Sequence, residues 1–319
     1  MYNTLIKSTA SYSPCSTDIT FMLLLNDNRI ALSSKDSNNI MLYTKEHFAF
    51  ELSLEGHKDT VIYITQLEDN RLVSSSSDKT VIIWELYKSS YVLKHIIGDI
   101  KFQLHTITIE QILQVDKKRM VLAGDDFRIM IYSTEEPYNM IKVIKPSSRY
   151  VVGVVYNDNR LYSFSKDDTM RVWNMKSYQC ESVLCNIACD IVYQIDKERI
   201  MIGENGIIKI ISMKDVKVIY TLKNNLLKNI VSMCEVKENV FIFGFCCGKI
   251  IKKGGVRIMN IKRNKVIDLI DDVIFTDIIK IDEEDKIITA NDYGFSIKGG
   301  IKKEEHMDYL PKIQIWSIQ

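Results

Sequence analysis

The 319-residue sequence contains no apolar run long enough to cross a membrane and no excess of charge of one sign. A transmembrane helix needs about 18 or more mainly apolar residues in succession, and no stretch approaches that length. The N-terminal segment lacks the apolar core of a secretory signal peptide. Lys and Arg total 42 against 41 Asp and Glu, which leaves a net charge of +1. This balance argues against recognition of nucleic acid or of an anionic membrane through overall charge.

Cysteine is scattered and odd in number, with seven residues and no paired CxxC spacing. In a chain without a secretory start, reduced thiols in the cytoplasm, with the nucleus as an alternative, are expected. The five histidines share no metal-ligand spacing. No GxxxxGK[ST], GxSxG, HExxH or EF-hand spacing occurs either. We therefore expect no metal, no cofactor and no enzymatic activity.

A repeat with a period of about 40 residues dominates what is present. Seven segments share a polar turn, a basic or Asn residue and an alternating apolar run, and their anchors fall at Arg29, Arg71, Arg119, Arg160, Arg199, Asn239 and Lys286. Each copy continues into a second apolar run, which ends at Tyr43, Trp84, Tyr132, Trp173, Ser212, Met259 and Trp316. All three tryptophans thus occupy one repeat position, which chance would rarely produce.

Each repeat also holds two further short runs, such as "FAFELSL" and "TVIYITQL". Four short strands per repeat with period-2 alternation are typical of the β-meander of a propeller blade. We expect an all-β fold, a single domain over residues 1–319 forming a seven-bladed β-propeller. Because the last repeat lacks one strand, residues near 2–9 are expected to complete the last blade and so protect its edge.

The second repeat, from Gly56-His57 through "LVSSSSDKTVIIWEL", resembles a WD40 repeat. The resemblance implies a hydrogen-bonded set of four side chains, His57, Ser74, Asp78 and Trp84, because a buried indole, imidazole and hydroxyl must all find partners. Repeat three keeps His105, Asp126 and Tyr132, with Leu122 in place of the hydroxyl. Repeat four keeps Ser163, Asp167 and Trp173 without the histidine, and repeat one offers Ser33, Asp36 and Tyr43.

Repeats six and seven carry insertions between their second and third strands, "FCCGKIIKKGG" and "NDYGFSIKGGIKKEEHMDYLP". In WD40-like blades this loop lies on the face of the blade-to-blade loops, where partners commonly dock. The resemblance therefore implies a partner-binding face that includes Lys58, Thr60, Thr108, Arg149, Lys166, Lys249, Lys252, Lys253, Lys302 and Lys303. The alternative is that the insertions are solvated loops without a role, with Glu304, Glu305 and Asp308 neutralising the second one.

Three functions follow from the resemblance. The first is a non-enzymatic scaffold, of the kind found in eukaryotic cells, that binds other proteins or peptides, including acidic or phosphorylated ones. The second is recognition of an anionic ligand, such as a phosphorylated segment or a phosphoinositide, although the FRRG motif of phosphoinositide-binding propellers is absent. The third is a propeller hydrolase that uses the central channel, which the mostly apolar first strands of the repeats disfavour.

Overall fold

The chain folds into β-strands joined by short turns. The computed structural model describes residues 6–12, 19–98, 108–124, 127–147, 149–224, 230–237, 239–247, 253–260, 265–271, 275–281, 286–291 and 312–318. Strands account for every regular element within these ranges. No helix in the described part of the chain is long and apolar enough to span a membrane. The expected all-β class is confirmed.

Six blades each consist of four consecutive antiparallel strands. Blades 1 to 3 contain β2 (Ile19–Leu24), β3 (Arg29–Ser34), β4 (Ile40–Thr44), β5 (Phe50–Leu54); β6 (Val61–Gln66), β7 (Leu72–Ser76), β8 (Val81–Tyr87), β9 (Ser90–Ile97); and β10 (Ile109–Asp116), β11 (Arg119–Gly124), β12 (Ile129–Ser133), β13 (Met140–Ile144). Blades 4 to 6 contain β14 (Val151–Asn157), β15 (Arg160–Ser165), β16 (Thr169–Asn174), β17 (Cys180–Cys185); β18 (Ile191–Gln194), β19 (Arg199–Glu204), β20 (Ile207–Ser212), β21 (Lys217–Lys223); and β22 (Ile230–Lys237), β23 (Val240–Cys247), β24 (Lys253–Asn260), β25 (Lys265–Asp271).

A further four-stranded sheet joins the two ends of the described chain. Its strand order is β1 (Ile6–Tyr12), β28 (Lys312–Ile318), β27 (Lys286–Asn291) and β26 (Phe275–Ile281). β1 pairs antiparallel with β28, from Ile6 opposite Ile318 to Tyr12 opposite Ile313. The N-terminal strand thus lies a few residues later than the expected 2–9.

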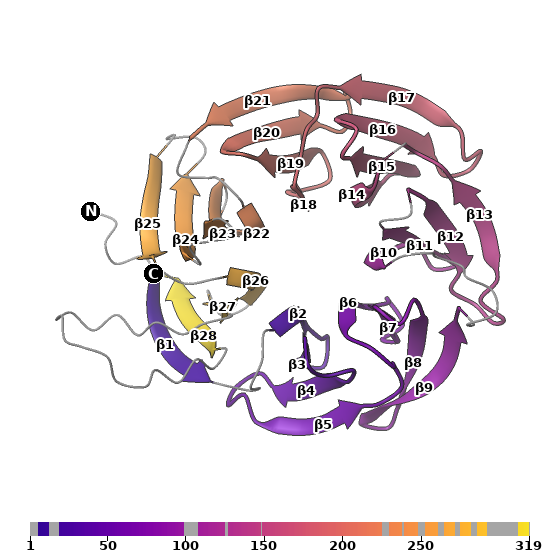
Figure 1. Ribbon diagram of the computed structural model, residues 1–319, viewed down its shortest axis with the longest axis vertical. Helices are drawn as coiled ribbons and strands as arrows, with labels where there is room; N and C mark the ends of the chain where they lie inside the picture. The colour runs from indigo at the N-terminus through magenta and orange to yellow at the C-terminus, as the bar shows by residue number, and fades with distance from the viewer. Residues whose placement is uncertain are drawn as a thin grey trace.

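The sheets are arranged around a central channel as a β-propeller (Figure 1). The first strand of each blade lies next to the channel and the fourth lies at the periphery (Figure 1). The described core clusters lie between neighbouring blades: one joins Leu42 and Leu54 of blade 1 to Ile82 and Trp84 of blade 2. Others join blades 2 and 3, 3 and 4, 4 and 5, and 5 and 6 in the same way. Burial of apolar surface, the main favourable term in folding, therefore couples each blade to the next.

Strand register places the aromatic residues of the third strands at one position in successive blades. Trp84 lies opposite Leu72, Tyr132 opposite Met120, and Trp173 opposite Leu161. In blade 5 the equivalent residue is Ile211, which lies opposite Ile200, and not Ser212, which lies opposite Arg199. The expected Ser212 was therefore wrong by one residue, which in a strand exchanges the two faces.

A β-bulge recurs near the start of the first strands. The register shifts between Ile19 and Phe21, between Val61 and Tyr63, and between Ile109 and Gln111. The same shift occurs between Val151 and Gly153 and between Ile230 and Ser232. The bulged residues are Thr20, Ile62, Glu110, Val152 and Val231. A bulge gives one strand an extra residue and re-aims its side chain.

The insertion in repeat six mainly lengthens a hairpin. β23 and β24 are paired from Val240–Asn260 out to Cys247–Lys253. Most of the insertion therefore belongs to a strand ladder and not to the long loop expected from the sequence. The insertion in repeat seven lies outside the described residues.

The repeated arginine at the start of the second strand joins neighbouring blades. In blade 1, Arg29 Nη2 donates to Asp27 Oδ2 at 2.6 Å, Nη1 donates to the Ser89 carbonyl of blade 2 at 3.0 Å, and the guanidinium lies over the Tyr91 ring. In blade 2, Arg71 bonds Asp69 at 2.6 Å and donates to the Tyr138 hydroxyl of blade 3 at 3.0 Å.

Blade 3 repeats this arrangement. Arg119 pairs with Asp116 and donates to the Met175 carbonyl and the Tyr178 hydroxyl of blade 4. Blade 4 departs from it, because Arg160 instead pairs with Glu181 of its own blade. The planar guanidinium, with its several donors, suits a contact that spans an acid, an aromatic ring and a hydroxyl or carbonyl.

This difference between equivalent arginines leads to a matched prediction. Arg71→Ala removes charged hydrogen bonds within and between blades, so the free energy of unfolding should fall by about 1–3 kcal/mol. Arg160→Ala removes one exposed ion pair and should cost about 0.2–1 kcal/mol. Urea denaturation of both variants measures the two costs. Equal losses would show that the contact between blades 2 and 3 adds nothing.

Candidate functional site

The blade-to-blade connections and the turns between second and third strands lie on one face, which we call the loop face. Its described part includes Lys35, Lys58, Thr60, Asp78, Arg149 and Lys166. Backbone contacts hold the two kinds of loop together: the Ser77 N–H donates to the Thr60 carbonyl at 2.9 Å, and the Lys166 N–H donates to the Tyr150 carbonyl at 3.1 Å. The Thr60 hydroxyl donates to the Lys35 carbonyl of the neighbouring blade at 2.8 Å.

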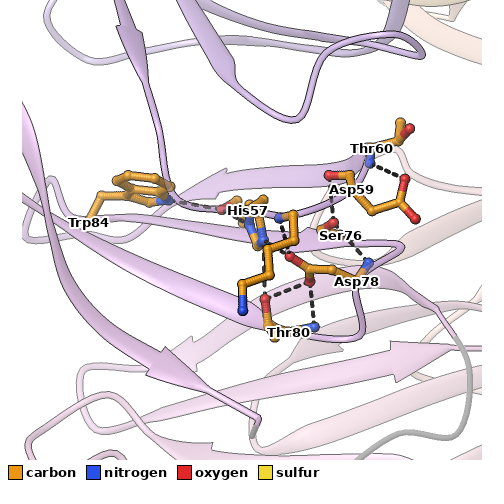
Figure 2. Close-up of polar contacts among 9 residues, drawn as sticks. His57, Asp59, Thr60, Ser76, Asp78, Thr80 and Trp84 are labelled. Atoms are coloured by element: carbon orange, nitrogen blue, oxygen red, sulfur yellow. Dashed lines mark hydrogen bonds and ion pairs between the residues drawn. The ribbon is translucent and has the colours of Figure 1, made fainter. Parts of the chain in front are cut away.

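Blade 2 brings together the four side chains implied by the WD40 resemblance (Figure 2). Trp84 Nε1–H donates to the Ser74 hydroxyl at 2.9 Å, and His57 Nε2 lies 2.8 Å from the same oxygen. His57 Nδ1 lies 3.1 Å from Asp78 Oδ2. Trp84, His57 and Ser74 are buried. The chain of bonds gives each of these buried polar groups a partner, as burial requires.

Asp78 connects this buried set to the loop face. Its carboxylate accepts from the Lys58 N–H at 2.7 Å, the Thr80 N–H at 2.8 Å and the Thr80 hydroxyl at 2.6 Å. Burial alone would raise the pKa of Asp78, but hydrogen bonds from His57, Thr80 and the Lys58 N–H hold it well below its usual range. An ionised carboxylate thus fixes the backbone that carries Lys58. The Ser76 hydroxyl fixes the next residue by donating to the Asp59 carbonyl at 2.8 Å (Figure 2).

Blade 4 keeps half of this arrangement and replaces the rest. Trp173 Nε1–H donates to the Ser163 hydroxyl at 2.9 Å. Without a histidine, Asp167 pairs with Arg171 at 3.1 Å and accepts from the Thr169 N–H at 3.1 Å. Burial raises the pKa of Asp167, but hydrogen bonds from the Thr169 hydroxyl and from Arg171 lower it below its usual range. The turn therefore keeps an ionised, hydrogen-bonded aspartate although its cationic partner lies on a strand.

Blade 1 does not form the set in the described structure, and of the set expected in blade 3 only Tyr132 is described. The Ser33 hydroxyl lies 2.7 Å from the Thr20 hydroxyl, and the Tyr43 hydroxyl points to Met41 Sδ at 3.7 Å. In blade 3, the Tyr132 hydroxyl is buried and has no hydrogen-bond partner in the structure as described. Burial raises the pKa of Tyr132 to about 12. His105 and Asp126, expected beside it, lie outside the described residues.

The residues expected to bind a partner differ in how available they are. Lys58 and Arg149 are exposed on the loop face, while Thr60 and Thr108 are partly buried. Lys166 is partly buried and paired with Asp190 across the boundary between blades 4 and 5. Side chains of the remaining candidates lie outside the described part: Lys249, Lys252, Lys253, Lys302 and Lys303.

Polar side chains of one blade also bond the inner strand of the next. Gln111 of blade 3 accepts from the Val154 N–H at 2.7 Å and donates to the Val154 carbonyl at 3.1 Å. The Thr20 hydroxyl donates to the Val61 carbonyl at 2.9 Å, and the Ser75 hydroxyl donates to the Ile109 carbonyl at 2.8 Å. These contacts were not predicted from the sequence, because their local signal is no more than a polar residue within or beside an apolar strand.

The channel opens at the loop face into a cavity of about 640 Å³. Its described lining comes from the starts of the first strands of blades 1 to 6, together with Lys35 and Asp190 on the rim. The bulged residues of five blades lie in this lining, as does Ile191 of blade 5. No group of three or more potential metal ligands occurs in the described part of the chain.

Most substitutions in a protein core lower the free energy of unfolding, but removal of the buried Tyr132 hydroxyl of blade 3 should not. Tyr132→Phe keeps the ring and removes a hydroxyl that has no partner among the described residues, so the free energy of unfolding should stay unchanged or rise by up to about 1 kcal/mol. Trp84→Phe, at the equivalent position of blade 2, breaks a satisfied bond and leaves a smaller ring, so it should cost about 1–3 kcal/mol. Chemical denaturation compares the two. A clear loss for Tyr132→Phe would mean that its hydroxyl has a partner in solution.

Comparison with known proteins identifies one part of the chain. Residues 49–85 match the WD domain, G-beta repeat family. They span β5, the outer strand of blade 1, and β6 to β8 of blade 2, and they include the set His57, Ser74, Asp78 and Trp84. No curated protein matches the chain. The chain therefore combines a β-propeller fold with a repeat similar to those of WD40 proteins, which in general act as platforms for protein interactions.

Proposed function

We propose that this protein is a non-enzymatic interaction scaffold that binds other proteins or peptides on its loop face. The observation that carries the proposal is the fixed backbone at the exposed connection before blade 2. Asp78, Ser76 and the Lys35 carbonyl each bond one residue of the segment Lys58–Thr60. The side chains of Lys58 and Asp59 remain exposed. A surface that is ordered before binding loses less conformational entropy when a partner docks.

The chemical nature of the partner remains a prediction. Lys58 and Arg149 provide exposed cationic groups on the loop face. The ion pair of Lys166 with Asp190 lowers the positive charge available beside them. An acidic or phosphorylated partner would use Lys58 and Arg149 and would gain mainly in association rate. Location in the cytoplasm or nucleus also stays a prediction.

Charge-reversal variants on each face of the propeller test the proposed binding surface. Lys58→Glu combined with Arg149→Glu should reduce capture of native partners from an extract of the source cell roughly tenfold, since buried or rim charges steer and hold partners. Quantitative mass spectrometry of the captured proteins measures this. The matched control, Lys117→Glu with Lys176→Glu, alters exposed turns between first and second and between third and fourth strands. If only the control variant lost its partners, the binding surface would lie on the face that carries Lys117 and Lys176 and not on the loop face.

We also propose that the sheet of β1, β26, β27 and β28 is the seventh blade of a ring that forms one domain. Antiparallel pairing of β1 with β28 supports this, because it gives a strand from each end of the described chain a partner. An unpaired strand edge would otherwise be free to join another chain.

Deletion of residues 1–12 tests this closure. The variant loses the seven-residue strand β1, so its melting temperature should fall by roughly 5 °C or more, at about 2–4 °C for each kcal/mol lost. Light scattering should also detect association through the freed edge of β28. Deletion of residues 1–5, which precede β1, is the control and should leave both properties unchanged. A monomeric 1–12 deletion with an unaltered melting temperature would rule out closure by β1.

A further inference from the structure

The bulges of three blades place apolar residues in the wall of the cavity at the channel mouth, while those of blades 1 and 3 place Thr20 and Glu110 there. Ile62, Val152 and Ile191 are partly buried, and 41% of Val231 is exposed to solvent. Ile62, Val152 and Val231 are each the extra residue of a bulge. Bulges beside functional sites commonly re-aim a side chain. Three blades therefore use the same backbone device to present a branched aliphatic group to one cavity.

Several polar side chains of the wall already have partners in the protein. Gln111 uses its carbonyl and its amide on the backbone of Val154. The Thr20 hydroxyl donates to the Val61 carbonyl and lies 2.7 Å from the Ser33 hydroxyl. A ligand that needed these groups would have to break bonds between blades. In the part of the wall beside Gln111 and Thr20, a ligand can make apolar contacts without such a cost.

Charges of both signs on the described lining disfavour a strongly charged ligand. The lining includes the carboxylates of Glu110 and Asp190 and the ammonium of Lys35. Asp190 is already paired with Lys166. An anion at the mouth would meet two carboxylates, and a cation would meet Lys35. Mixed charge around apolar walls complements an uncharged apolar group that is flanked by polar backbone.

We propose that the channel mouth binds one large aliphatic or aromatic side chain from an extended segment of a partner protein. This inference rests on the proposed function, since it places the anchor of the docked partner at the centre of the loop face. The cavity volume of about 640 Å³ lies within the range of small-ligand pockets, roughly 300–1,000 Å³, and exceeds the space that one side chain needs. A central apolar anchor surrounded by polar contacts is the usual form of an interface hot spot.

Selection of peptides provides the test, because the natural partner is unidentified. A phage-displayed library of random dodecapeptides is selected on the wild-type protein, and the binders are synthesised for calorimetry. We expect binders that share one Leu, Ile, Met, Phe or Trp. Replacement of that residue by Ala, or Val231→Glu in the protein, should weaken binding roughly tenfold or more, since each removes apolar burial.

Val183→Glu is the matched control. Val183 is 51% exposed on β17, the outermost strand of blade 4, so both variants place a glutamate at an exposed valine. Unchanged melting temperatures for the two variants would show that neither disturbs the fold. The inference would be overturned if the binders tolerated Val231→Glu or shared no apolar residue. Failure to select any peptide whose binding depends on Val231 would also overturn it.

The same peptides separate this inference from the proposed function. Binders weakened by Lys58→Glu but not by Val231→Glu would leave the loop face as the docking surface and remove only the apolar anchor. If Val183→Glu weakened the binders while Lys58→Glu and Val231→Glu did not, both the loop face as docking surface and the apolar anchor would be wrong.

Discussion

The innermost strand of each blade has a backbone edge that no strand of its own sheet covers. Such a strand pairs with its own second strand and leaves its other edge to the channel and to the neighbouring blade. Buried N–H and C=O groups on that edge need partners. Thr20, Ser75 and Gln111 provide them, each from one blade to the inner strand of the next. With the apolar clusters between blades, these bonds make the interface between neighbouring blades the basic stabilising unit.

The polar sets of blades 2 and 4 show which part of the WD40-like arrangement the fold needs most. Both blades keep an aspartate in the turn after the second strand, bonded to backbone N–H groups. The cation or imidazole beside it comes from different places, a loop in blade 2 and a strand in blade 4. The elements common to both blades are thus the ionised turn aspartate and the hydrogen bond from the tryptophan to the serine hydroxyl. The histidine adds a link from that turn to the buried tryptophan.

Local sequence patterns predicted the strands and blades, but they could not predict the contacts between blades. Alternation of apolar residues and the position of Trp84 and Trp173 identified strands and blades, because these signals lie within one repeat. The partner of Gln111 lies 43 residues away, and those of Arg29 and Arg71 lie in the next blade, so no local pattern reveals them. Ser212 was predicted in place of Ile211 because a fixed number of residues was counted from Arg199, whereas the position is set by the pairing of β19 with β20. The bulges escaped notice for the same reason, and with them the residues that line the channel mouth.

The pairing of β1 with β28 has a consequence for biosynthesis. Among the described strands, β1 leaves the ribosome first and β28 last, so their sheet cannot form until all the strands between them have left the exit tunnel. The blades between them consist of consecutive strands and can assemble earlier, one hairpin after another. Closing so long a loop carries an entropic cost that contacts already formed must offset. During synthesis, β1 is therefore a strand without its partner, and its exposed edge is a place where a chaperone could act.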